Sequence, residues 1–140
     1  MSGLEAFLNP FSVQAENIKC VVSKRFKDTE GKPVPWELRA LTEDEVDAIR
    51  KSCTTREKTK TGGFQEVTDS NAVAAKMLVA SVVFPNLKDA ELQAAWGVRG
   101  ADALARKILL AGEYTNLLFK TQEIAGFDTD INELVDDAKN

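Results

Sequence analysis

Hydrophobic and polar residues alternate in two segments near the start of the chain. The first is IKCVVSKRF (residues 18–26) and the second is VPWELRAL (residues 34–41). A period of two is typical of strands with one buried face, and the intervening DTEGK favours a turn. We therefore predict an antiparallel β-hairpin over residues 18–41. Pro35 has no backbone N–H to donate, so its strand is expected to lie at a sheet edge there.

A helical period begins after residue 41. Thr42 and Glu45 have the spacing of a capping box, and Leu41 with Val46 has that of a hydrophobic staple, so a helix is predicted to start here. The TTREKTKTGGF stretch that follows is polar and glycine-rich. It predicts a mobile loop near residues 54–67.

The next predicted helix is apolar on nearly every side. It begins at Asp69 or Ser70, runs through NAVAAKMLVASVVF to Phe84 and stops at Pro85, with Lys76 as its only charge. A helix of this kind must be covered all round, so we place it at the centre of a helical bundle.

Shorter helical patterns fill the rest of the chain: residues 88–96 closed by Gly97, residues 101–110, residues 113–125, and a final DINELVDDA segment. We therefore predict a single domain over residues 1–140, of the α+β class but mainly α. Its N-terminal antiparallel β-hairpin packs on a compact bundle of about five to six short helices. Residues 42–140 form the helical part.

One residue departs from its helix pattern. Tyr114, Leu117, Leu118, Thr121, Ile124 and Ala125 form an apolar stripe on the helix at residues 113–125. Phe119 points roughly opposite that stripe. Three interpretations stay open: the final helix covers Phe119, a partner binds it, or it is a solitary exposed aromatic residue.

The same three interpretations apply to the apolar residues near the N-terminus. Residues 1–17 are predicted to be irregular because Asn9-Pro10 breaks any early helix. Phe7, Leu8 and Phe11 follow no settled period there. Together with Phe119, they are the candidate partner-binding residues.

Composition excludes several kinds of site. The 140 residues include no histidine and only two cysteines, Cys20 and Cys53, in unrelated contexts. Histidine is the commonest general base and transition-metal ligand, and a zinc site needs clustered cysteines or histidines. We therefore predict no catalytic residues, no cofactor and no metal, and a protein that is not an enzyme.

The sequence also predicts where the protein resides. No stretch approaches the 18 or so consecutive apolar residues of a transmembrane helix. The N-terminal MSGLEAFLNPF lacks the basic and apolar regions of a signal peptide. We therefore expect a cytoplasmic protein with no membrane partner.

Charge is unevenly distributed along the chain. The net charge is −4, but residues 50–60 hold five basic residues and one acid, whereas residues 113–140 hold seven acids and two lysines. The overall negative charge argues against general nucleic-acid binding. A small nucleic-acid-binding regulator nevertheless stays as an alternative, through the basic residues Arg50, Lys51, Arg56, Lys58 and Lys60.

Three stretches together resemble a known protein family. They are RALTEDEVDAIRKSCT, then VFPNLKDAELQAAWGVRGADALARKILLAGEYTNLLFKTQEIAGFD, and the ending INELVDDAKN. The combination of NL-x-DAELQ, WGV-x-GA, GEY-x-x-L and GFD is similar to the XkdN-like tail assembly chaperones of long-tailed bacteriophages and PBSX-like prophages. The resemblance covers nearly the whole chain.

The resemblance implies a non-enzymatic assembly factor made in the bacterial cytoplasm. Such proteins are thought to bind the tape measure protein, prevent its aggregation and help tail tube protein polymerise around it. They are not expected in the mature virion. A structural tail component of the virion is the other alternative.

Overall fold

The computed structural model describes residues 3–127 and 131–139. The predicted antiparallel pair is present as β1 (Ile18–Cys20) and β2 (Trp36–Leu38), with Ile18 opposite Leu38. These strands are three residues long and thus shorter than the sequence pattern suggested. The predicted turn lies within the long connection between them, where Gly31 adopts a φ of 80°.

A third strand makes β2 the central one. Residues Val82–Phe84 form β5, which pairs antiparallel with β2 and gives the order β1-β2-β5. The prediction that Pro35 marks an edge strand was therefore wrong, because β2 is the central strand. Pro35 lies one residue before β2 begins and so is not part of its hydrogen-bonded ladder. The prediction of a helix continuing to Phe84 was also wrong. The short apolar run VVF suits a strand as well as a helix, and periodicity cannot separate the two.

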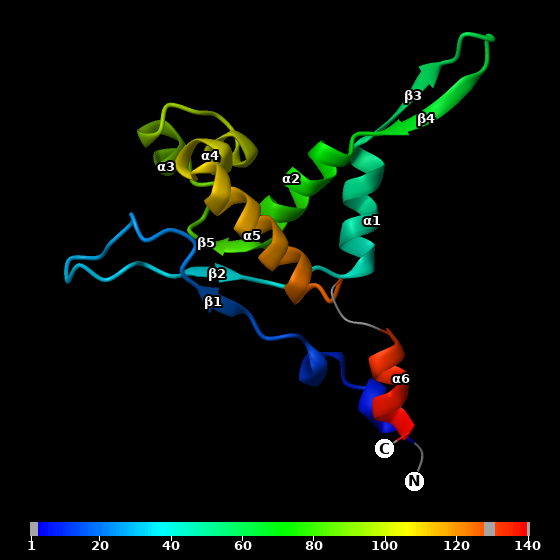
Figure 1. Cartoon of the computed structure of the whole chain (residues 1–140), viewed down its shortest axis with the longest axis horizontal. Coiled ribbons are helices and arrows are strands. Elements are labelled where there is room, and N and C mark those ends of the chain that lie inside the picture. Colours follow the sequence, from blue (N-terminus) through cyan, green and yellow to red (C-terminus); the bar gives the residue numbers. More distant parts are fainter. Residues whose placement is uncertain (1–2, 128–130, 140) are drawn as a thin grey trace.

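Six α-helices are present in the described residues, and most are short. They are α1 (Glu43–Ser52), α2 (Ser70–Ser81), α3 (Ala90–Ala95), α4 (Ala101–Ile108), α5 (Ala111–Ile124) and α6 (Ile131–Lys139). Helix α2 contacts α1, α4 and α5 and leads directly into β5 (Figure 1). This confirms the α+β class and the central position expected for the apolar helix.

The main core lies where α2, α4 and α5 meet the three-stranded sheet. Its members are all at most 7% exposed: Trp36, Leu38, Leu78, Leu87, Leu104, Ala105, Ile108, Leu109 and Leu117. A smaller cluster of Leu41, Val46 and Met77 joins α1 to α2. Leu41 and Val46 are the two residues of the predicted hydrophobic staple, which is therefore confirmed.

The expected mobile loop near residues 54–67 is a second β-hairpin instead. Strands β3 (Thr54–Lys58) and β4 (Phe64–Thr68) pair antiparallel over five residues each and project from the body (Figure 1). Both faces of this hairpin are largely exposed, so its sequence lacks the hydrophobic alternation of a half-buried strand. The signals that were present are β-branched residues and the turn glycine Gly62, which has a φ of 91°.

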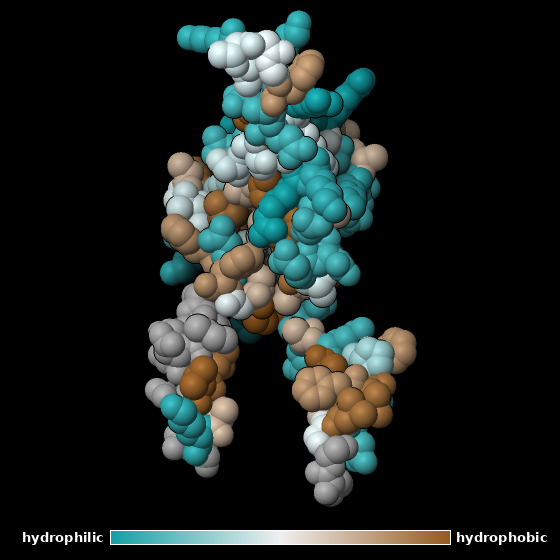
Figure 2. Space-filling model, turned by 90° about the vertical axis from the view of Figure 1, so that its right-hand side faces the viewer, coloured by the Kyte–Doolittle hydropathy of each residue, from teal (hydrophilic) through white to brown (hydrophobic). Residues whose placement is uncertain are grey.

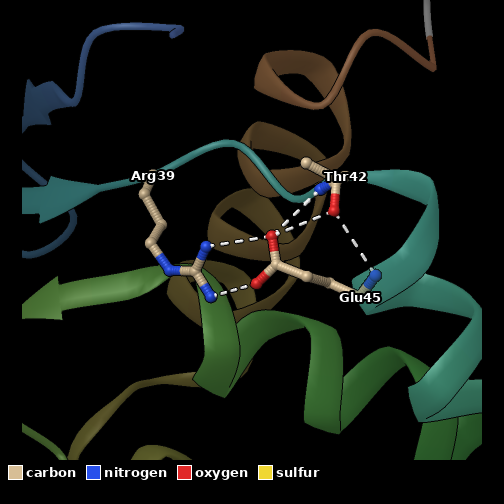
Figure 3. A network of polar contacts seen from close by, with 3 residues as sticks. All are labelled: Arg39, Thr42 and Glu45. Carbon is tan, nitrogen blue, oxygen red and sulfur yellow. Dashed lines mark hydrogen bonds and ion pairs between the residues drawn. The ribbon is translucent and has the colours of Figure 1, made fainter. Parts of the chain in front are cut away.

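A polar network joins the sheet to α1. The Arg39 guanidinium donates to both oxygens of the Glu45 carboxylate, at 3.2 and 2.5 Å (Figure 3). The same carboxylate accepts from the Thr42 backbone N–H at 3.1 Å, while the Thr42 hydroxyl accepts from the Glu45 N–H at 3.4 Å. The predicted capping box is therefore confirmed, and it also anchors the end of β2.

A second network fixes the connection between β1 and β2. Arg25 donates to the Glu113 carboxylate and to the Ile108 carbonyl, each at 2.7 Å. Glu113 also accepts from the Leu110 N–H at the start of α5, at 2.8 Å. One arginine thus ties the long connection to the junction between α4 and α5.

These contacts make folding stability depend on pH. The hydrogen bond from Arg39, followed by that from the Thr42 N–H, lowers the pKa of Glu45 from 4.5 to about 2. Because the folded-state pKa lies below the unfolded value, this contribution is complete above about pH 4.5 and is lost as pH falls toward about 2. We expect Glu45→Gln to lower the unfolding free energy by about 0.5–1 kcal/mol at neutral pH, since both side chains are more than a third exposed.

The measurement is urea unfolding of wild type and variant at several pH values between about 2 and 7. The difference in unfolding free energy should shrink as the pH is lowered through that window. Arg39→Leu removes the first cause of the depressed pKa and should give the same trend. A difference that stays constant with pH would contradict the assignment.

Candidate functional site

The N-terminal arm, defined as residues 3–13, carries a dense group of exposed apolar side chains. It is folded into two short 3₁₀ helices, η1 (Gly3–Phe7) and η2 (Pro10–Val13), with the Asn9 side chain accepting from the Phe11 N–H at 3.2 Å. Its large apolar residues are 60–84% exposed: Leu4, Phe7, Leu8, Phe11 and Val13. The arm is therefore structured locally without burying its own hydrophobic residues.

The arm projects from the body of the protein. In Figure 2 it is the right-hand projection at the lower end, and brown hydrophobic residues gather on it. Helix α6 forms a separate projection at the same end, although the two overlap in the view of Figure 1. The three N-terminal residues predicted as partner-binding, Phe7, Leu8 and Phe11, thus lie together on one extended element.

Phe119 lies elsewhere, on the outer face of α5. It is 64% exposed, whereas Leu117 and Thr121 on the same helix are each 1% exposed. The predicted stripe of α5 is therefore confirmed, and the interpretation that the final helix covers Phe119 was wrong. Phe119 shares a shallow depression with Gln122, Glu123 and Phe127, and Phe127 is 56% exposed.

The structure thus divides the four candidate residues between two surfaces. Phe7, Leu8 and Phe11 belong to the N-terminal arm, and Phe119 belongs to what we call the α5 patch, Phe119 with Phe127. No residue of the arm lines the depression beside Phe119. A partner that uses both surfaces must therefore contact two separate elements of the fold.

The structure contains an apolar pocket that was not predicted from the sequence. It has a volume of about 180 Å³ and is lined by Phe26, Val34, Trp36, Phe84, Pro85, Leu92, Trp96 and Ile108. Trp36 is only 3% exposed, as expected of a core residue, and Trp96 contacts Phe26 edge-on with ring centroids 6.1 Å apart. The lining residues come from five separate parts of the chain, so no local motif could have revealed the pocket.

The predicted basic run does not form one continuous surface. Arg50 pairs with Glu43 at 3.3 Å and Lys51 pairs with Asp47 at 3.0 Å, both on α1. The other basic residues lie on the β3–β4 hairpin, where the Arg56 guanidinium stacks 4.4 Å from the centre of the Phe64 ring. The basic surface is therefore smaller than the sequence suggested.

Other kinds of site find little support in the described residues. Cys20 and Cys53 are both free thiols, and burial raises the pKa of Cys20. Within residues 3–127 and 131–139, no three His, Cys, Asp or Glu residues are grouped as metal ligands would be. None of the helices described is long and apolar enough to cross a membrane.

Comparisons with known proteins point to one family. The phage XkdN-like tail assembly chaperone proteins match residues 4–139. Two relatives from Bacillus subtilis (strain 168) align over 138 residues, which is 98% of this chain and 93% of each relative. They are the protein YqbN, at 36% identity, and the phage-like element PBSX protein XkdN, at 33% identity. The crystal structure of YqbN is similar with a TM-score of 0.74 and 34% identity, covering 88% of this chain and 96% of that one.

The exposure of Phe119 leads to a stability prediction. Phe119→Ala should change the unfolding free energy by less than about 0.5 kcal/mol, because the ring contributes little to the core. Leu117→Ala, two residues away on the buried face, should cost about 2–5 kcal/mol. Thermal and urea unfolding of the two variants would check this. A loss of about 3 kcal/mol or more for Phe119→Ala would show that the ring is part of the core.

Proposed function

The chain belongs to the XkdN-like family of phage tail assembly chaperones, and we propose that it binds the tape measure protein and assists assembly of the tail tube around it. It does so as a non-enzymatic factor in the bacterial cytoplasm and is absent from the finished particle. Tail tube protein is a second partner in this scheme. The N-terminal arm is the principal binding surface and the α5 patch is an additional contact.

The density of exposed apolar residues on the arm carries this proposal. Single exposed hydrophobic residues are common on protein surfaces, whereas contiguous groups mark interaction sites. Five large apolar residues fall within residues 4–13, each at least 60% exposed. Covering one such side chain contributes about 1.5–3 kcal/mol, so a partner that covers several gains enough to bind.

The form of the surface suits a helical partner. A helix with an apolar stripe presents anchors at i, i+3, i+4 and i+7, and such stripes bind to complementary apolar surfaces. The arm offers Phe7, Leu8 and Phe11 within five residues of the chain, each at least 66% exposed, as apolar side chains that such a stripe can contact. A tape measure protein that exposes long helical apolar segments before assembly would therefore bind to such an arm through these segments.

The small size of each surface fits a factor that must be released. Small interfaces are typical of transient complexes, whereas obligate ones bury much more area. Arm and α5 patch are separate, so a client segment can leave one surface while still held at the other. Growth of the tube can then displace the chaperone stepwise.

We expect co-expression with the tape measure protein of the same gene cluster to keep that client soluble and to allow the two to co-purify. The triple variant Phe7→Ser, Leu8→Ser, Phe11→Ser should lose most of this effect, because it removes the apolar anchors of the arm. Client solubility after centrifugation and recovery on a tagged chaperone are the two readouts.

The matched control replaces exposed apolar residues of the body. Val21 and Leu110 are 48% and 58% exposed, so Val21→Ser with Leu110→Ser removes apolar surface without altering the arm. This variant should behave as wild type. Equal loss in both variants, or an insoluble client with the wild-type chain, would contradict the proposal.

A further inference from the structure

The β3–β4 hairpin has a tip of basic and aromatic residues that is not part of either hydrophobic cluster. Residues 56–64 contain three basic residues and one acid. Phe64 is 56% exposed and stacks under Arg56, and Lys58 lies directly opposite Phe64 across the hairpin. The tip is therefore a small cationic surface around an exposed ring.

Helix α6 has a net charge opposite to that of the hairpin tip and also exposes apolar side chains. Residues 131–139 read INELVDDAK, with three acidic residues and one lysine. Its Leu134 and Val135 are 48% and 47% exposed, and Asp137 is exposed as well. The helix thus combines exposed aliphatic side chains with a net charge of opposite sign to that of the hairpin tip.

The two surfaces cannot meet within one chain. Both views place the β3–β4 hairpin at the upper end of the molecule and α6 at the lower end, with the helical body between them (Figures 1 and 2). Their charges and exposed apolar residues can therefore complement each other only between molecules.

We propose that the hairpin tip of one copy docks on α6 of a second copy of this chain. The cationic side chains Arg56, Lys58 and Lys60 approach α6 at its exposed Asp137, and the Phe64 ring packs against the exposed Leu134 and Val135. Opposite charges steer the two surfaces together and select their orientation. A charge pair that is exposed to solvent contributes little free energy by itself. The apolar contact adds buried hydrophobic surface to the interface.

The geometry makes this contact a head-to-tail one. When each copy contributes its hairpin to one neighbour and its α6 to another, association propagates as an open row or closes into a ring, of which a reciprocal antiparallel pair is the smallest. The N-terminal arm projects separately from α6 and stays free in each copy (Figure 2). Self-association therefore does not depend on the client-binding function proposed above.

Sedimentation velocity and light scattering of the full chain, without client, test the contact. The mean mass should rise with protein concentration. Raising the salt from about 0.1 M to about 1 M shortens the Debye length from about 10 Å to about 3 Å and should weaken the association by roughly tenfold.

Charge reversal at each end gives the sharper test. One variant carries Arg56→Glu, Lys58→Glu and Lys60→Glu, and the other carries Glu133→Lys, Asp136→Lys and Asp137→Lys. Each alone should be monomeric, because like charges then face each other. An equimolar mixture should associate again, since each variant supplies the complement of the other.

The control variant reverses three exposed lysines on the body, Lys19→Glu, Lys88→Glu and Lys107→Glu. It has the same net charge as the hairpin variant and should associate as wild type does. Circular dichroism confirms that each variant is folded. A wild-type chain that stays monomeric at all concentrations, or a mixture that fails to associate, would overturn the proposal. Client capture by such a monomer would leave the proposed function standing.

Discussion

Helix α2 has apolar residues on nearly every side, and covering them determines where the other elements lie. Leu78 is completely buried, and α1, α4 and α5 each contact the helix. The chain passes from Ser81 straight into β5, and the Ser81 carbonyl accepts from the Arg39 N–H at 2.8 Å. One helix thus fixes both the bundle around it and the sheet at its end, because most of its side chains are apolar and only a few positions, such as Asn71 and Lys76, are exposed to water.

Two charged networks extend this arrangement to segments that the core does not reach. Arg39 holds Glu45 and the start of α1 against the end of β2, and Arg25 holds Glu113 and the start of α5 against the connection that follows β1. Both networks sit at helix N-termini, where a carboxylate also satisfies backbone N–H groups. Beyond them, the N-terminal arm, the β3–β4 hairpin and α6 extend outward, and they hold many of the exposed apolar residues of the chain.

How well each element could be predicted depended on whether its signal was local. The start of α1 was readable because a capping box involves residues only three positions apart, and the stripe of α5 was readable from its period. The end of α2 was misread because Val82–Phe84 is equally apolar on all positions, and only pairing with β2 makes it a strand. The β3–β4 hairpin was misread because its two faces are both solvated, so burial left no alternating pattern in the sequence. The apolar pocket could not be predicted at all, because tertiary contacts assemble it.

The candidate residues show the same division. The sequence showed that Phe119, Phe7, Leu8 and Phe11 do not belong to the apolar face of a helix or strand. Whether another element covers them depends on the tertiary structure. For Phe119 the structure answers it, because the buried side of α5 is already occupied by Leu117 and Thr121 and the ring is left outside. The arm is exposed for a different reason: its two short 3₁₀ helices are too small to form a core of their own. Apolar surfaces that lie on separate elements, held apart by a rigid body, cannot collapse onto one another. They therefore stay exposed, and this exposure supports the partner binding proposed above.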